Sequence, residues 1–131
     1  MIPTYGLTHI AVRVSDLEKS LLFYTIVFGA RVMYRQEDFV QIQTPGANDI
    51  IVLQKSEDFF PNDRGIIHFG FGMKDPSGLK QLASDVSSGG GKVKEQGEFV
   101  PGEPYAFILD PDGYEIEVWY EKIPVELKSF N

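Results

Sequence analysis

Residues 8–12 read THIAV and residues 67–71 read IHFGF, so an apolar, strand-like pattern with one histidine occurs twice in the chain. The two histidines, His9 and His68, are 68 − 9 = 59 residues apart, and the chain contains no others. A repeat spacing of this size, in a chain of 131 residues, indicates a duplicated unit. Each half of the chain is therefore interpreted as one copy of the same module.

The elements predicted around each stretch follow the same order. Alternating apolar residues predict a strand over 5–14, and Ser15 with Glu18 is typical of a capping box that begins a helix. This helix is expected over 16–28, with Gly29 as its C-terminal cap. Strands are then expected at 30–36, 38–43 and 49–54, and the second half repeats the order with a strand at 65–74, a helix at 77–88 and strands at 92–98, 105–109 and 114–121. The predicted order is βαβββ in both halves.

The composition fits one globular domain. Hydrophobic residues make up 43% of the chain and charged residues 24%, and no apolar run approaches the ~20 residues that span a bilayer. Residues 1–5 lack the pattern of a secretory signal, and the absence of cysteine fits a cytoplasmic location. A net charge of −7 disfavours nucleic acid as a partner. A small molecule is the expected ligand.

The two histidines are the first candidates for chemistry. Because side chains alternate along a strand, His9 shares a face with Ala11, and His68 shares a face with Gly70 and Gly72. Small residues beside each imidazole leave room for a ligand. The simpler alternative is a half-buried strand histidine that makes one hydrogen bond. The equivalent position of both histidines in the repeat favours a shared function.

A carboxylate candidate comes from residues 110–120. The sequence Asp-Pro-Asp-Gly at 110–113 predicts a tight turn, and the strand after it places Glu115, Glu117 and Trp119 on one face. A solvated outer face would explain two glutamates equally well. However, this strand closes the second module, and an inward-facing carboxylate is costly unless it is paired or bound to a metal. Glu117 lies farther from the turn than Glu115 and is the preferred candidate.

Taken together, these pieces resemble the vicinal oxygen chelate superfamily, which includes glyoxalase I, fosfomycin-resistance transferases, bleomycin-resistance proteins and extradiol dioxygenases. The resemblance rests on residues 7–24, 67–69 and 110–117 and extends over about residues 7–121. It implies a single domain with an α+β fold, in which two βαβββ modules form a curved, cup-shaped mixed sheet. The expected bounds are about 5–54 for module one, 55–64 for a linker, about 65–121 for module two and 122–131 for a C-terminal tail.

The resemblance also implies one divalent metal ion. The superfamily's metal ligands fall on His9, His68 and Glu117 of this sequence. Two imidazoles and one carboxylate suit Fe, Mn, Zn or Ni and leave coordination positions open for a substrate. Members of the superfamily usually dimerise, sometimes by exchanging modules. We therefore expect a homodimer, with the site built either within one chain or between two.

One position departs from the pattern of the four-ligand members. Glyoxalase I has a further glutamate in the last strand of its first module, and the matching position here is Val52, within one residue. The resemblance therefore implies a metal-dependent enzyme with dioxygenase-like or lyase/transferase chemistry rather than a true glyoxalase I. One alternative is a metal-free protein that binds a drug or metabolite, as bleomycin-resistance proteins do. Another is a non-catalytic protein in which any metal is structural.

Auxiliary residues are expected around the metal. Arg13, on the same strand face as the first histidine, could bind an anionic substrate group or be simply solvated. Tyr105 is a candidate acid–base or hydrogen-bonding group, whereas Tyr120 faces away and is expected to pack. Trp119 is expected to form a wall of the substrate pocket. Residues 59–64 join the modules as a linker and could form a lid.

Overall fold

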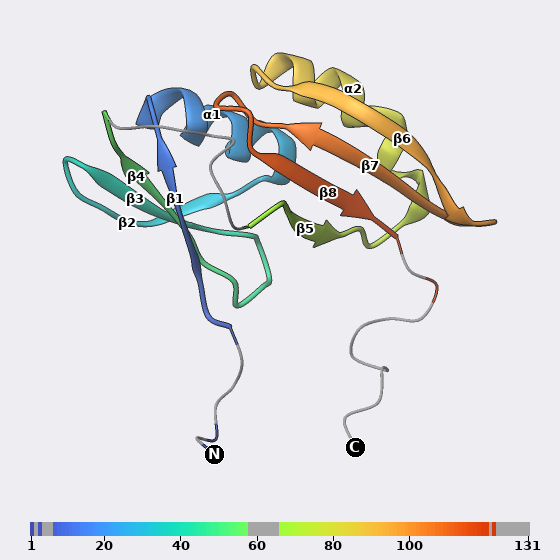
Figure 1. Cartoon of the computed structure of the whole chain (residues 1–131), viewed down its shortest axis with the longest axis horizontal. Coiled ribbons are helices and arrows are strands. Elements are labelled where there is room, and N and C mark those ends of the chain that lie inside the picture. Colours follow the sequence, from blue (N-terminus) through green and yellow to red (C-terminus); the bar gives the residue numbers. More distant parts are fainter. Residues whose placement is uncertain (2, 4–6, 58–65, 121, 123–131) are drawn as a thin grey trace.

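The computed structural model describes residues 1, 3, 7–57, 66–120 and 122, and its elements form two groups that lie side by side (Figure 1). Each group contains one four-stranded sheet and one α-helix. No helix in these ranges is long and apolar enough to cross a membrane. The proposed lid at 59–64 and nearly all of the predicted tail lie outside the described residues.

The βαβββ order predicted from the repeat is confirmed in both modules. Module one consists of β1 (Ile10–Val14), α1 (Leu17–Phe28), β2 (Arg31–Arg35), β3 (Phe39–Gln43) and β4 (Ile51–Lys55). Module two consists of β5 (Phe69–Gly72), the short 3₁₀ helix η1 (Pro76–Gly78), α2 (Leu79–Ser88), β6 (Lys92–Val100), β7 (Glu103–Leu109) and β8 (Glu115–Trp119).

The two sheets have the same topology. Their strand orders are β1-β4-β3-β2 and β5-β8-β7-β6, and in each sheet the first strand of the module pairs in parallel with the last. Ala11 is opposite Val52 in the first sheet, and Gly70 is opposite Glu117 in the second. The predicted α+β fold is therefore confirmed, with the strands distributed over two four-stranded sheets.

Helix α1 begins differently from the prediction and ends as predicted. Its N-cap is Asp16, whose carboxylate accepts the backbone N–H of Lys19 at 3.1 Å. The predicted capping box at Ser15 is wrong, because this serine donates its hydroxyl and its backbone N–H to Asp112 instead. Gly29 follows the helix with φ = 68°, a left-handed conformation that glycine adopts without steric cost.

Helix α1 also joins the two modules. Phe23 and Tyr24 are fully buried, and Phe28 stacks on Phe71 of β5 with ring centroids 3.9 Å apart. The ring of Phe23 lies so close to Gly91 that an added Cβ there would be 2.5 Å from its Cε2 atom. The buried apolar side chains of both modules consequently form one continuous cluster. Packing across the module boundary is thus part of the core.

A polar contact reinforces this boundary at the turn before β8. The buried Tyr24 hydroxyl donates to Asp110 at 2.8 Å, and Asp110 also accepts the backbone N–H groups of Asp112 and Tyr114 at 3.0 and 2.9 Å. Burial raises the pKa of Asp110 to about 6, although these hydrogen bonds favour its charged form. The last turn of module two is therefore bonded to the first helix of module one.

Candidate functional site

The parallel pairing of β5 with β8 places the second histidine beside a carboxylate. Phe69 and Phe71 pack against the core, so the residues between and beside them, His68 and Gly70, face the other side of the sheet. Gly70 is opposite Glu117, and a Cβ at this glycine would lie 3.1 Å from the Glu117 carbonyl oxygen. The small residue therefore allows the two strands to bring the imidazole and the carboxylate together.

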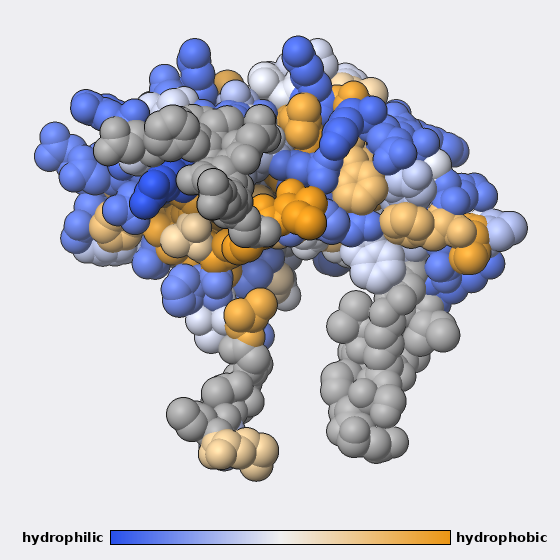
Figure 2. Space-filling view, viewed as in Figure 1, coloured by the Kyte–Doolittle hydropathy of each residue, from blue (hydrophilic) through white to orange (hydrophobic). Residues whose placement is uncertain are grey.

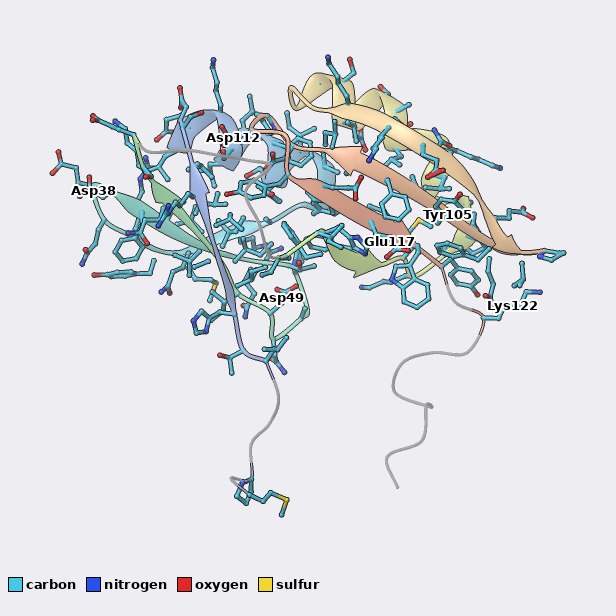
Figure 3. The ribbon with its side chains drawn as sticks, viewed as in Figure 1. Asp38, Asp49, Tyr105, Asp112, Glu117 and Lys122 are labelled. Carbon is cyan, nitrogen blue, oxygen red and sulfur yellow. The ribbon has the colours of Figure 1, made fainter. Side chains whose placement is uncertain are left out.

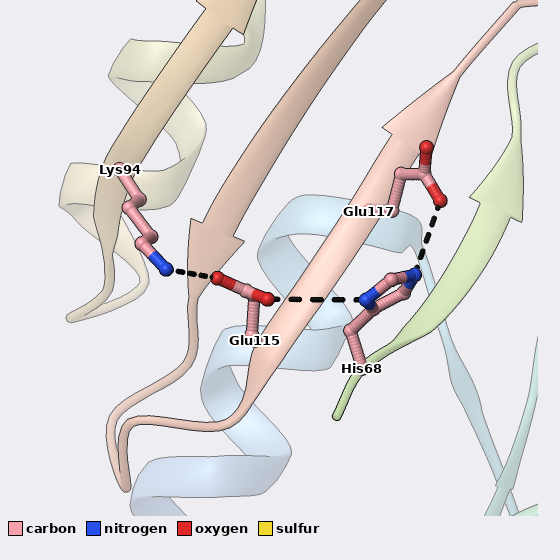
Figure 4. A network of polar contacts seen from close by, with 4 residues as sticks. All are labelled: His68, Lys94, Glu115 and Glu117. Carbon is pink, nitrogen blue, oxygen red and sulfur yellow. Dashed lines mark hydrogen bonds and ion pairs between the residues drawn. The ribbon is translucent and has the colours of Figure 1, made fainter. Parts of the chain in front are cut away.

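His68 lies between two glutamates of β8 (Figure 4). Its Nε2 atom is 3.4 Å from Oε2 of Glu117, and its Nδ1 atom is 3.8 Å from Oε2 of Glu115. The two glutamate side chains are only 17–18% exposed, and that of the histidine is 37% exposed. The three side chains thus form a partly shielded polar cluster on one face of the second sheet.

The cluster continues through Glu115 to a lysine on another strand. Lys94 of β6 donates to Oε1 of Glu115, while the other carboxylate oxygen faces the histidine. This hydrogen bond and the attraction between the two charges raise the pKa of Lys94. The lysine therefore stays protonated and places its positive charge against the carboxylate of Glu115.

Aromatic side chains border the polar cluster. The ring of Phe107 packs edge-on against the imidazole of His68 at 5.4 Å, and Tyr105 continues the row at 5.7 Å from Phe107. Tyr105 stacks on Phe99 and is opposite Trp119 in the β7–β8 pairing. Figure 3 shows Tyr105 and Glu117 on neighbouring strands of this face, and Figure 2 shows hydrophobic surface at the centre of the same view.

The first histidine lies next to the other sheet, just before its strand β1. His9 directly precedes β1, is exposed, and makes a 2.9 Å hydrogen bond with the hydroxyl of Thr8. Within the described ranges of one chain, no three His, Asp or Glu side chains converge tightly enough to hold a metal ion. The structure therefore brings His68 and Glu117 together in one chain but leaves His9 apart from them.

Arg13 belongs to the sheet of module one rather than to that of the polar cluster, although its backbone contacts Tyr114, the residue before β8. It lies on β1, where it is exposed and opposite Gln54 of β4. Trp119 and Tyr105, in contrast, belong to the same sheet as His68 and Glu117. Of the predicted auxiliary residues, the structure groups these two aromatic side chains, and not Arg13, with the polar pair.

Comparison with known proteins identifies the family. Residues 6–118 match the profile described as Glyoxalase/Bleomycin resistance protein/Dioxygenase superfamily. The chain belongs to this superfamily. The architecture agrees, since the chain superimposes on a glyoxalase-related enzyme from Fulvimarina pelagi with a TM-score of 0.77 at 16% identity, covering 92% of this chain and 91% of that one.

Curated relatives within the superfamily carry several different names. The chain is 31% identical over 124 residues to a probable lactoylglutathione lyase of Synechocystis, covering 86% of this chain and 92% of the relative. It is 30% identical over 133 residues to a probable trivalent organoarsenical cleaving enzyme of Bacillus subtilis, covering 92% and 84%. It spans only 42% of two plant lactoylglutathione lyases that it matches and 34% of a third. Relatives of this chain are therefore enzymes with different reactions.

The strand pairing shows which residue of module one occupies the position that Glu117 occupies in module two. Gly70 and Glu117 are opposite each other in module two, and the equivalent pair in module one is Ala11 and Val52. The strand position predicted from the sequence is thus supported by the pairing. Module one therefore has Val52 at the position where module two has the carboxylate of Glu117.

Sequence patterns did not reveal the contact between Lys94 and Glu115 or the packing of Phe107 on the histidine. Both depend on which strands are neighbours, since β7 and β8 pair so that Phe107 is opposite Glu117. The alternation along β8 already placed Glu115 on the correct face. The alternation along β6 did not predict the face on which Lys94 lies, because bulges interrupt that alternation.

Proposed function

We propose that this chain is a metal-dependent enzyme of the glyoxalase/bleomycin resistance/dioxygenase superfamily that binds a small substrate through two neighbouring oxygens. The observation that carries the proposal is the 3.4 Å separation between Nε2 of His68 and Oε2 of Glu117. Two ligands that are each about 2.1 Å from one metal ion are separated by roughly 3.0–3.4 Å, depending on the coordination angle. The distance between these two atoms fits one imidazole and one carboxylate on a shared ion.

We propose His68, Glu117 and His9 as the protein ligands of this ion. When bound, a divalent metal acts as a Lewis acid on the two substrate oxygens. Trp119 and Tyr105 would border the substrate on the same sheet, with Tyr105 as the candidate hydrogen-bonding group. Arg13 remains the candidate for binding an anionic substrate group, because its backbone contacts Tyr114, the residue before β8.

A second copy of the chain would supply the missing histidine. His9 is exposed at the start of an edge strand, and its neighbour Leu7 is fully exposed. All five residues of β2 are exposed, including Val32, Met33 and Tyr34. Apolar side chains in such positions favour burial against another subunit. We therefore propose a homodimer in which His9 of one copy approaches His68 and Glu117 of the other.

Metal analysis tests the core of the proposal. Purified protein should contain, or bind after addition, one equivalent of Fe, Mn, Zn or Ni per site. His9→Ala, His68→Ala and Glu117→Gln should each lower metal occupancy sharply and leave the circular dichroism spectrum unchanged. The exposed Glu98 of β6 offers a matched control, Glu98→Gln. A wild-type protein that binds none of these metals would refute the enzyme proposal.

Hybrid dimers test whether the site lies between chains. In an exchanged dimer of one His9→Ala chain and one Glu117→Gln chain, one site carries both changes and the other carries neither. Each variant alone should bind little metal. Mixing and refolding the two should therefore restore up to half of the metal sites in the hybrid dimers. If each site were built within one chain, mixing would restore none. Light scattering would report the oligomeric state of each sample.

Val52 narrows the range of reactions that we propose for the site. Glyoxalase I needs a carboxylate from module one, so lactoylglutathione lyase activity is not the first expectation despite the similar relatives. Dioxygenase-like or lyase/transferase chemistry is compatible with three protein ligands. The relative named as a trivalent organoarsenical cleaving enzyme supports testing an organoarsenical as well as a catechol and a fosfomycin–thiol pair. Turnover that depends on added metal would support the proposal.

A metal-free binding protein of the bleomycin-resistance type is the second candidate. The hydrophobic and aromatic side chains around Tyr105, Phe107 and Trp119 favour it, because they could retain a flat apolar ligand without a metal. Binding of a drug or metabolite that is unaffected by a chelator and by Glu117→Gln would favour this function over the enzyme.

A further inference from the structure

We infer that Glu115, held by Lys94, is the positioning residue that fixes the ring of His68 with its Nε2 atom toward Glu117. This inference rests on the proposed function, because the orientation of the ring matters most if Nε2 binds a metal ion. It assigns roles to two residues that the ligand pattern does not include. The contacts in Figure 4 form a continuous row from the lysine through both glutamates and the histidine.

The row crosses the sheet from β6 toward β5. The strand order is β5-β8-β7-β6, so Lys94 on β6 reaches over β7 to contact Glu115 on β8. Glu115 then faces the histidine that precedes β5. Strands β6 and β8 and the residue before β5 therefore contribute to one polar chain, and shifting any of them would change the position of the imidazole.

The burial of Glu115 explains why the lysine is needed. Its side chain is 17% exposed, nearly the same as that of Glu117, and a shielded carboxylate costs free energy unless a positive charge or a donor stabilises it. Lys94 supplies both, and it keeps one carboxylate oxygen engaged while the other faces the imidazole. Glu115 is thereby held as an acceptor at a fixed place.

The two nitrogens of His68 face different partners. A neutral imidazole carries one N–H, and an acceptor at Nδ1 favours the tautomer that leaves the Nε2 lone pair free. Histidines that bind metals usually donate their second N–H to a carboxylate or carbonyl in this way. Nδ1 lies 3.8 Å from Oε2 of Glu115, which is longer than a hydrogen bond, so the carboxylate acts on the Nδ1–H group through its charge. Phe107 packs against the imidazole in a T-shaped arrangement, which favours one orientation of the ring.

The first test measures the tautomer of His68 without any metal. The chain has two histidines, so the ¹⁵N signals of His68 can be assigned by comparison with the His9→Ala variant. At a pH where the imidazole is neutral, we expect the share of the Nδ1–H form to be larger in the wild type than in Glu115→Leu, because Glu117 faces Nε2 in both proteins. The same ratio of the two forms in both proteins would overturn the inference.

The second test measures binding of Mn²⁺ by titration calorimetry. Glu115→Gln should lower the affinity by roughly 10–100-fold, the range typical of a residue that supports a metal ligand. Lys94→Met should lower it in the same direction by less. Lys92→Met and Glu98→Gln, on the same strand as the lysine, are the matched controls and should leave it unchanged.

The outcomes separate this inference from the proposed function. If the wild type binds no metal, the proposed function fails, while the tautomer experiment still decides the role of Glu115. If the wild type binds metal and Glu115→Gln binds it equally well, the positioning role is refuted and the metal site stands. If Glu115→Gln removes binding as completely as Glu117→Gln, Glu115 is a direct ligand and the inference is wrong.

Discussion

The two modules share one topology but differ in what they place on it. Gly70 and Glu117 of module two occupy the same register positions as Ala11 and Val52 of module one. The second sheet therefore brings an imidazole within 3.4 Å of a carboxylate, whereas the first sheet places an exposed histidine near small and apolar side chains. A duplicated backbone can thus retain its pairing while only one copy keeps the polar pair.

The two helices differ in how much they contribute to packing between the modules, and here module one contributes more. In α1, Phe23 and Tyr24 are fully buried, and both contact module two, whereas α2 contributes the smaller Val86. Module one therefore supplies much of the packing on which module two depends. We expect substitutions in α1 to change mainly stability and substitutions around His68 to change mainly ligand binding.

The largest effect on stability should come from Phe23→Ala. Truncating a fully buried phenylalanine costs about 3–5 kcal/mol, and here it also opens a cavity beside Gly91 of module two. The matched change in the other helix, Val86→Ala, should cost about 2 kcal/mol, because fewer apolar groups are lost. Urea unfolding monitored by circular dichroism would measure both. Equal losses would contradict the unequal roles of the two helices.

Asp110 should make the boundary between the modules sensitive to pH. Its pKa is raised to about 6 from 3.8, so folding favours the protonated form. The resulting stability is fully present below pH 4 and is lost as the pH rises through 6. The loss is about 3 kcal/mol, since each unit of pKa shift is worth about 1.36 kcal/mol.

This pH dependence can be isolated with Asp110→Asn, which cannot ionise. Urea unfolding would measure the free energy of unfolding of both proteins from pH 4 to pH 7. Over this range the wild type should lose most of the roughly 3 kcal/mol relative to the variant. A difference that stays constant over this range would show that Asp110 ionises normally in the folded protein.

Glu117→Val would make module two match module one at the decisive position. The affinity for a divalent metal should fall by roughly 100-fold or more, about 2.8 kcal/mol, because a ligand is removed. The unfolding free energy should change by less than in Phe23→Ala. Titration calorimetry with Mn²⁺ measures the first quantity, and urea unfolding measures the second. Retained affinity would mean that Glu117 is not a ligand.

The smallest expected effect concerns the contact between Ser15 and Asp112. Ser15→Ala removes a hydroxyl that donates to this carboxylate across the module boundary, and it should cost about 1 kcal/mol. Ser88→Ala, an exposed change at the end of α2, is the control and should be within roughly 0.5 kcal/mol of the wild type. A cost as small as that of the control would mean that the contact contributes nothing to holding the modules together.

The sequence predicted the elements well because their signals are local. Gly29 marked the end of α1, and the alternation around each histidine marked the strands. The start of α1 was predicted wrongly because Ser15 and Asp16 are both good capping residues. The choice between them depends on Asp112, which is 97 residues from Ser15 in the chain and attracts the serine away from the helix.

By itself, the sequence determined which side chains share a strand face, because alternation is a property of each strand alone. It thereby grouped Glu115 with Glu117 and predicted that His68 has small neighbours on its face. Only the tertiary structure decided which faces meet. The parallel pairing of β5 with β8 brings His68 to Glu117, and the strand order lets Lys94 reach Glu115. His9 remains beside the other sheet, just before β1. Distances between strands depend on long-range pairing, which no local pattern specifies.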